Sequence, residues 1–307
     1  MRIDPYVTVF GLARFYKYEV AESNMTAQGE AQIVFTTEKR DLQGIGVTVV
    51  VTLYNYEAYI KNALDSVFSQ SYPNIELVVV DDASHDGSLD TARWWLEQNS
   101  ARFSRAILLT HLKNAGVARA RNSAFANATN EYVFVLDADN ELKPEAIAKL
   151  LSACISAGTQ AAYSRIEKFG EETGTLGGVW KPSALARGNY IDAMALIRKS
   201  AWKAAGGYDG TISVQGWEDY DLWCKFVELG FKGEFVPESL CRYRVHRTSM
   251  LRVETNPKID KLKLEMRQRH PWLKLQPPAW KKAYYWLRYF LVAALSKRIR
   301  KENTEAL

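Results

Sequence analysis

Continuous apolar runs separated by helical segments are the feature that most restricts the fold of this chain. Four runs rich in β-branched residues have the composition of strands buried on both faces of a sheet, at 47–53, 75–80, 106–110 and 132–136. Segments with helical spacing of apolar residues alternate with them, at 57–70, 89–98 and 117–126. Because parallel strands require crossover connections, this alternation predicts an α/β fold with a doubly wound, mostly parallel sheet flanked by helices.

The regions on either side of this alternation are less regular. We expect residues 1–46 to form a small extension with short strands at 7–10 and 33–35. After the fourth strand we expect a helix, a strand, a mobile glycine-rich loop and a second helix, at 144–157, 160–166, 170–188 and 219–230. From 257 onward we expect helices broken by Pro271 and Pro277. The predicted division is an extension at 1–46, a main domain at 47–255 with halves at 47–140 and 141–255, and a helical tail at 256–307.

Cysteine usage and charge limit where the chain works and what it binds. Its three cysteines are widely spaced and form no disulfide pattern, which indicates a reducing cytoplasm. The first residues show no basic stretch followed by an apolar run, as a secretion signal would. No segment reaches the roughly 20 apolar residues that span a bilayer. Residues 256–307 carry a charge of +9 in a chain of net charge +5, which predicts an anionic partner for the tail.

Polar side chains follow three of the predicted strands at the point where each strand ends. Tyr54 and Asn55 follow the first strand, Asp81 and Asp82 the second, and the sequence Asp-Ala-Asp at 137–139 the last. The carboxyl ends of neighbouring parallel strands meet at one edge of a sheet, where ligands bind in such folds. Two carboxylates at this spacing suit Mg²⁺ or Mn²⁺ that bridges to substrate phosphates. A helix cap is the alternative role, because a predicted helix follows.

Seven short segments together resemble the family 2 glycosyltransferases of the GT-A fold. In chain order they are VTLYNYE (51–57), VDDASHDG (80–87), NAGVARARN (114–122), LDADN (136–140), GGYD (206–209), WEDYD (217–221) and YRVHRTS (243–249). Each segment alone is modest evidence, whereas all seven in this order are highly specific. The resemblance runs from residue 47 to about 250 and implies an inverting transfer of a sugar from a UDP-sugar to an acceptor hydroxyl. Ala83 stands where many relatives have Gly, and Asn140 where many have Asp.

The resemblance places the nucleotide at the ends of the first two strands. Tyr54 is expected to stack on the base, and Thr52 to line the same pocket. Asp82 is expected to accept the imide N–H of uracil. A strand-end cap is the alternative role of Asp82, because residues 83–87 have the composition of a turn.

A second group of residues is implied to hold the rest of the donor. Asn114 and Arg121 are expected to bind the nucleotide, Arg121 through a charge-assisted contact. A surface ion pair is an equally supported alternative for Arg121. Arg244 and Ser249 are expected to reach the diphosphate. The further donor contacts implied by the resemblance are Glu57, Asp137 and Ala138.

The resemblance also implies a divalent metal ion, Mn²⁺ or Mg²⁺. Asp139 is expected to bind it directly, and Asp137 to contact the ribose or a water on the metal. His246 resembles the third ligand, because it lies in a Tyr-Arg-x-His-x-x-Ser segment, and imidazole suits Mn²⁺. A lone histidine is more often structural, and we assign that role to His85, His111 and His270.

Catalysis is assigned to the pair Glu218 and Asp219. Asp219 matches the family's general base, which takes the proton of the acceptor hydroxyl. Glu218 is expected to orient hydroxyl groups of the acceptor or sugar. Both carboxylates could instead cap the helix that follows, where negative charge is favourable. Trp217 could offer an apolar face to a sugar ring, and packing in the core is its alternative role.

The acceptor and the tail complete the expectations. We expect a glycan or lipid-linked glycan acceptor, as in bacterial surface polysaccharide synthesis. Residues 279–301 place an apolar, aromatic run between basic clusters, which is typical of a helix lying at a membrane surface. Packing on the main domain or on another subunit is the alternative for this segment. Such a tail would hold the enzyme on the cytoplasmic face of the inner membrane.

The sequence argues against two other classes of function. The chain lacks a GxGxxG segment, which argues against a dinucleotide-dependent oxidoreductase. The acidic main domain argues against a nucleic-acid partner. A non-catalytic module that binds carbohydrate or nucleotide-sugar on the same fold is the remaining alternative. The presence of Asp137, Asp139, Asp219 and His246 together favours the enzyme.

Overall fold

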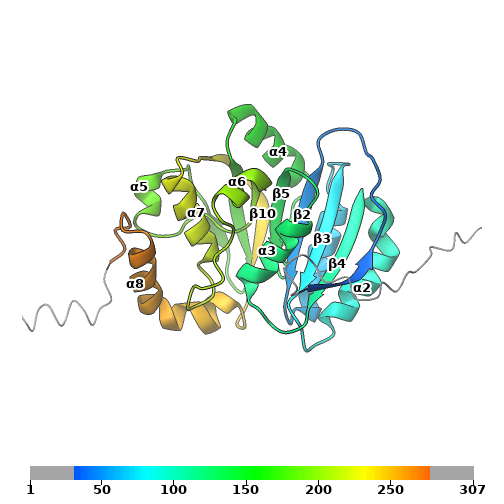
Figure 1. Cartoon of the computed structure of the whole chain (residues 1–307), viewed down its shortest axis with the longest axis horizontal. Helices are drawn as coiled ribbons and strands as arrows, with labels where there is room; N and C mark the ends of the chain where they lie inside the picture. Colours follow the sequence, from blue (N-terminus) through cyan, green and yellow to red (C-terminus); the bar gives the residue numbers. More distant parts are fainter. Residues whose placement is uncertain (1–30, 277–307) are drawn as a thin grey trace, which may run out of the picture.

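A ten-stranded mixed sheet lies at the centre of the computed structural model, which describes residues 31–276 (Figure 1). The strand order is β1-β4-β3-β2-β5-β9-β7-β10-β6, and β8 pairs with β7 outside this order. The two faces of the sheet carry separate hydrophobic clusters, because successive residues of a strand point to opposite faces. Val50 and Val78 belong to one cluster, and Val49 and Leu77 to the other. The molecule is therefore a sheet covered by helices on both faces, as predicted.

The first half of the sheet contains the four predicted parallel strands. They are β2 (Val47–Leu53), β3 (Ile75–Asp81), β4 (Arg105–His111) and β5 (Tyr132–Asp137). Every residue of β2 and β3 is buried, which explains their continuous apolar composition. The connecting helices are α1 (Glu57–Phe68), α2 (Ser88–Asn99) and α3 (Val117–Asn127), with a 3₁₀ turn at Ser100–Arg102. The predicted elements of this half are confirmed to within one or two residues at most ends.

The second half of the sheet reverses direction at β9 (Ala195–Arg198). This short strand is antiparallel to β5 on one side and to β7 (Ala161–Gly170) on the other. Next to β7 lies β10 (Gly233–Val245), which is parallel to it, and β6 (Glu141–Leu142) closes the edge. The helices of this half are α4 (Ala146–Ala157), α5 (Pro182–Leu185), α6 (Lys199–Ala204) and α7 (Glu218–Glu228). Because β9 runs backwards, the residues just before it lie at the edge where β5 ends.

The regions predicted with the weakest patterns differ in detail. Strand β1 (Ala31–Thr36) includes the predicted strand at 33–35 and pairs antiparallel with β4. Residues 170–188, expected to be a loop, include the short strand β8 (Gly174–Leu176) and α5. After β10 come a π-helical turn at Leu251–Thr255, a 3₁₀ turn at Asn256–Lys258 and α8 (Ile259–Arg269), the first predicted helix of the tail. The strand predicted at 7–10 and the segment 279–301 lie outside the described residues.

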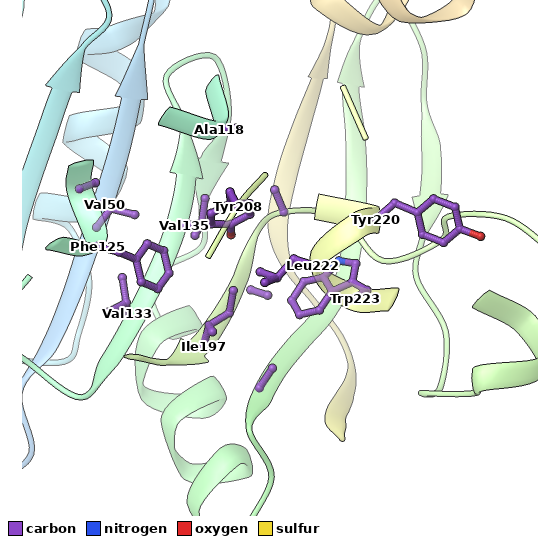
Figure 2. Packing of buried hydrophobic residues seen from close by; sticks show 14 of the residues in the cluster. Val50, Ala118, Phe125, Val133, Val135, Ile197, Tyr208, Tyr220, Leu222 and Trp223 are labelled. Carbon is purple, nitrogen blue, oxygen red and sulfur yellow. The ribbon is translucent and has the colours of Figure 1, made fainter. Parts of the chain in front are cut away.

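The two halves of the main domain share one core. Figure 2 shows Val50, Phe125, Val133 and Val135 of the first half packed beside Ile197, Leu222 and Trp223 of the second. All of these side chains are buried. The three cysteines are also buried and free, so none forms a disulfide. No helix within residues 31–276 is long and apolar enough to cross a membrane.

Candidate active site

The polar strand ends meet at one edge of the sheet, as predicted. In the β2–β5 pairing Thr52 stands opposite Asp137, and in the β2–β3 pairing Leu53 stands opposite Asp81. The Thr52 hydroxyl donates a hydrogen bond of 3.2 Å to Oδ1 of Asp137. Parallel pairing in register therefore brings the ends of β2, β3 and β5 into one polar site.

Arg121 lies beneath this site and holds Asp137. Its Nη2 donates a 2.8 Å hydrogen bond to Oδ1 of Asp137, and its guanidinium lies over the ring of Tyr208 at 5.4 Å. Burial disfavours the charge on Arg121, but Asp137, Tyr208 and Glu218 together outweigh this effect, so the pKa of Arg121 lies above its ordinary value. The side chain is only 4% exposed, so the ion pair is buried and the surface-pair alternative is wrong. Its Nε has no hydrogen-bond partner among the described residues.

Asp139 and His246 meet although 107 positions separate them in the sequence. Nε2 of His246 lies 3.0 Å from Oδ2 of Asp139, and Nδ1 lies 3.0 Å from the hydroxyl of Thr248. Asp139 lies between β5 and β6, and β6 pairs with β10, which ends just before His246, so this pairing brings the two residues together. Burial raises the pKa of Asp139, His246 opposes this through its hydrogen bond, and Asp137 adds to the rise.

This pair of side chains fits part of a metal site. A carboxylate and an imidazole whose Oδ2 and Nε2 atoms lie 3.0 Å apart are suitable ligands for Mn²⁺. No group of three or more possible ligands is found within residues 31–276, and Asp137 is bound to Arg121 instead. Divalent ions at phosphate sites take the remaining positions from water and substrate phosphates. Asp139 and His246 could therefore hold an ion together with a diphosphate, and the role of Asp137 as a ligand stays a prediction.

Asp219 and Glu218 begin α7 and use their carboxylates differently. Oε2 of Glu218 accepts the backbone N–H of Gly216 at 2.8 Å, and burial raises the pKa of this nearly unexposed side chain. Asp219 is partly exposed; its Oδ1 accepts the N–H of Tyr220 at 2.7 Å, and its Oδ2 accepts Nδ2 of Asn189 at 3.0 Å. Burial among the site residues raises the pKa of Asp219 to about 7, against the attraction of Arg121. This carboxyl can accept and release a proton near neutral pH.

Tyr54 and Asp82 lie in very different surroundings. Tyr54 is 38% exposed, and its ring and that of His85 lie edge-to-face with centroids 6.3 Å apart, so stacking on a base stays a prediction. Asp82 is buried: Oδ1 accepts the N–H of Ala115 and contacts Nδ1 of His111, and Oδ2 accepts the N–H of Gly116. Asp82 therefore has a structural role, but its carboxylate holds residues 115–116 and His111, whereas the N–H of Ser84 in the turn donates to Asp81. Its contact with uracil stays a prediction.

The turn after β3 is built by two further polar residues. Asn114 donates from Nδ2 to the backbone oxygen of Asp82 at 3.3 Å, and Glu57 accepts the N–H of Gly87 at 3.1 Å. Ala83 has a φ of +58°, a left-handed conformation that costs an L-residue about 1–2 kcal/mol. Glycine would adopt this conformation without that cost.

The predicted contacts of the diphosphate lie on and after β10. Nη2 of Arg244 lies 2.6 Å from Oε1 of Glu141, and its Nε donates to the backbone oxygen of Asp139 at 3.0 Å. Oδ1 of Asn140 accepts the N–H of Arg244 at 2.9 Å, so Asn140 fastens β10 to the Asp-Ala-Asp segment. The side chain of Arg244 thus makes its contacts within the protein. Ser249 is buried, and its backbone N–H donates to the backbone oxygen of His246. Ala138 is fully buried, and its contact with the donor stays a prediction.

Two of the predicted structural histidines are held by carboxylates. His111 contacts Asp82 and the hydroxyl of Ser123, at 2.6 and 2.9 Å. His270 contacts Asp221 and Glu228, at 3.0 and 2.7 Å.

Trp217 is half-buried. It packs edge-to-face on Tyr220 with ring centroids 5.3 Å apart, and it lies against the core.

Two polar residues of the site were missed by the sequence analysis. Asn189 and Asp192 precede β9, and Asn189 reaches Asp219 directly. Burial, Asp219 and Asp137 together raise the pKa of Asp192 to about 7. The apolar run 193–197, which overlaps β9, is the signal that could have placed them at a strand edge.

Comparisons with known proteins identify the family. The sequence model of "Glycosyl transferase family 2" matches residues 48–212. EpsE of Bacillus subtilis (strain 168), which is named a glycosyltransferase, is 30% identical over 208 residues, covering 66% of this chain and 73% of EpsE. TuaG of the same organism, named a teichuronic acid biosynthesis glycosyltransferase, is 26% identical over 211 residues, covering 66% of this chain and 81% of TuaG.

Solved structures share the fold at low sequence identity. TarS 1–349 of S. aureus in complex with UDP-GlcNAc has a TM-score of 0.59 at 17% identity, covering 73% of this chain and 65% of TarS. The mannosyltransferase PcManGT from Pyrobaculum calidifontis in complex with GDP-Man and Mn²⁺ has a TM-score of 0.54 at 24% identity, covering 66% and 58%. With the family match over more than half of the chain, the protein belongs to glycosyl transferase family 2 and is a glycosyltransferase of the GT-A fold.

Proposed function

We propose that this enzyme is an inverting, metal-dependent glycosyltransferase that moves a sugar from a UDP-sugar to a glycan or lipid-linked glycan. The observation that carries the proposal is the carboxyl of Asp219. It is partly exposed, has a pKa of about 7, and shares the cation Arg121 with Asp137. A proton acceptor is thus present beside the residues suited to a diphosphate.

The chemistry follows from the roles of these residues. Asp219 takes the proton of the acceptor hydroxyl, whose oxygen attacks the anomeric carbon as the bond from that carbon to the diphosphate breaks. Attack from the opposite face inverts the configuration, so an α-linked donor gives a β-linked product. Glu218, fixed by the N–H of Gly216, orients hydroxyl groups beside the base. A divalent ion held by Asp139 and His246 would supply positive charge that stabilises the leaving diphosphate.

UDP and a surface-polysaccharide acceptor are supported by the relatives. TarS was solved with UDP and with UDP-GlcNAc, and TuaG is named for teichuronic acid biosynthesis. PcManGT was solved with GDP-Man, so GDP-mannose belongs in any donor panel.

The experiment measures release of the nucleotide diphosphate from UDP-sugars and GDP-mannose, with Mn²⁺, with Mg²⁺ and with EDTA. We expect one preferred donor, release that needs the metal, and a loss of at least a hundredfold in Asp219→Asn, because general-base catalysis contributes about 10²–10⁴-fold. Asp90→Asn, a change at an exposed position of α2, is the control and should behave as wild type. No release from any donor, with no metal-enhanced binding of UDP or GDP, would instead indicate a non-catalytic module.

The position of the enzyme in the cell is proposed from the tail. Residues 279–301 lie outside the described residues, and their basic and aromatic composition favours the anionic cytoplasmic face of the inner membrane. We expect full-length protein to sediment with anionic liposomes and protein lacking 277–307 to stay in solution. Equal sedimentation of both would contradict the membrane role.

A further inference from the structure

Asp192 lies where the sheet changes direction. The last pair of β5 and β9 is Phe134 with Leu196, and β9 runs antiparallel to β5. Asp137 stands three residues beyond Phe134, and Asp192 stands four residues before Leu196. Both therefore lie at the same edge of the sheet, on neighbouring strand ends.

One oxygen of Asp192 is bound by the protein and the other is not. Oδ1 accepts the backbone N–H of Met194 at 2.9 Å, which fixes the side chain in a turn. No hydrogen bond from residues 31–276 reaches Oδ2, and the residue is partly exposed. A carboxylate oxygen crowded by protein but left without a donor is suited to accept hydrogen bonds from a ligand.

Three charged residues of the site act on Asp192. Asp219 and Asp137 are the carboxylates that act most strongly on it, and Arg121 is the cation that opposes them. Burial and the charge of Asp192 also raise the pKa of Tyr243 on β10. Asp192 therefore lies within electrostatic range of the proposed base Asp219 and of the ion pair between Arg121 and Asp137.

The order of the strands assigns parts of a nucleotide-sugar to positions along this edge. The order is β3-β2-β5-β9, with Tyr54 after β2 and Asp139 after β5. With the base stacked on Tyr54 and the diphosphate beside Asp139, the next position along this edge belongs to the sugar. That position is the N-terminal end of β9. The anomeric carbon must also lie between the diphosphate and Asp219 for the transfer to occur. The transferred sugar is thus the ligand group nearest Asp192.

We propose that Asp192 binds hydroxyl groups of the transferred sugar and so contributes to the choice of donor. This inference rests on the proposed function. Sugar hydroxyls supply the donors that Oδ2 lacks, and a carboxylate that bridges two of them distinguishes epimers by their geometry. Asp192 therefore affects binding of the complete donor and not binding of the free nucleotide.

The test compares the dissociation constants of the nucleotide and of the whole donor by calorimetry. Wild type, Asp192→Asn and Asp192→Ala are titrated with UDP and with UDP-glucose, UDP-galactose, UDP-GlcNAc and UDP-GalNAc, and with GDP and GDP-mannose. We expect the variants to bind the free nucleotide within about twofold of wild type. The preferred sugar nucleotide should bind Asp192→Ala at least tenfold more weakly, as for a lost hydrogen bond to a charged group. Asp192→Asn keeps the size and the contact with Met194, and Asp90→Asn is the exposed control.

The outcomes separate this inference from the function on which it rests. Equal weakening of nucleotide and sugar nucleotide would assign Asp192 a structural role and overturn the inference. Unchanged donor binding with a raised KM for the acceptor would place Asp192 on the acceptor and overturn it too. Wild type that binds neither nucleotides nor sugar nucleotides would overturn the proposed function, and the inference with it.

Discussion

Asp219 owes its protonation behaviour to a few named neighbours. Glu218 and Asp192 disfavour its negative charge, Arg121 favours it, and Asn189 donates a hydrogen bond of 3.0 Å to its Oδ2. The charged form of Asp219 is the one that works as a base, so its neighbours set the lower pH limit of activity.

The pH profile should show this dependence. We expect kcat/KM to rise with pH through about 7, as Asp219 loses its proton. Asn189→Ala removes a hydrogen bond that stabilises the charged form of Asp219. The pKa of Asp219 then rises, and the acid limb of the profile moves to higher pH. Asp192→Asn removes a negative neighbour and should move the limb to lower pH. Initial rates between pH 5.5 and 9 measure both shifts, and shifts in the same direction would contradict this account.

The contact of His246 with Asp139 leads to a prediction about metal binding. Removal of either side chain leaves a divalent ion with one protein ligand instead of two. We expect His246→Ala to weaken binding of Mn²⁺, in the presence of UDP, at least tenfold. Binding measured by electron paramagnetic resonance tests this, with exposed His85→Ala as the control. Unchanged affinity in His246→Ala would remove His246 from the set of ligands.

At the scale of elements, α7 depends on the residues after α8. His270, just beyond α8, is buried between Asp221 and Glu228, both on α7. Burial lowers the pKa of His270, but the two carboxylates outweigh it, so the pKa lies above 6.5. Trp272 also donates from Nε1 to Glu228 at 2.8 Å. The helix that begins with Glu218 and Asp219 is thus held in place by His270 and Trp272, which follow α8.

This contact predicts a pH-dependent contribution to stability. Below a pH of about 6.5 His270 is charged in both folded and unfolded states, and its ion pairs contribute fully; the contribution is lost as pH rises through the raised folded pKa. We expect His270→Gln to lower the free energy of unfolding by about 1–3 kcal/mol at pH 6 and by less at pH 9. Urea denaturation at both values measures the difference. An equal loss at both would show that the charge of His270 does not contribute.

At the scale of the whole molecule, the two halves of the main domain form a single core. Val50 and Val135 of the first half share a buried cluster with Ile197 and Trp223 of the second. The cluster on the other face likewise contains residues of both halves, such as Val49 and Leu240. Neither half can bury these surfaces alone.

Shared clusters predict one cooperative unfolding transition. We expect urea transitions followed by far-ultraviolet circular dichroism and by tryptophan fluorescence to coincide. UDP with Mn²⁺, at about 100 times its dissociation constant, should stabilise the protein by about 2.7 kcal/mol, because it binds only the folded edge. Two separate transitions would show that the halves unfold independently.

The parallel half of the fold was predictable because its signal is local. A strand buried on both faces can be apolar throughout, and β2 and β3 are. Helical periodicity then located α1, α2 and α3. The convergence of Thr52, Asp82 and Asp137 followed from topology alone, since parallel strand ends share one edge.

The other half of the site depends on contacts between distant parts of the chain. Strand β9 has only four residues, and nothing local in the sequence gives its antiparallel direction, which brings Asn189 and Asp192 into the site. The burial of Arg121 and the engagement of Asp82 by Ala115 and Gly116 likewise arise from packing. The apolar patterns of this chain specify which elements form and which edge binds the ligand, because those depend on neighbours in sequence. Which polar groups are buried, paired or left open depends on side chains that only the folded sheet brings together.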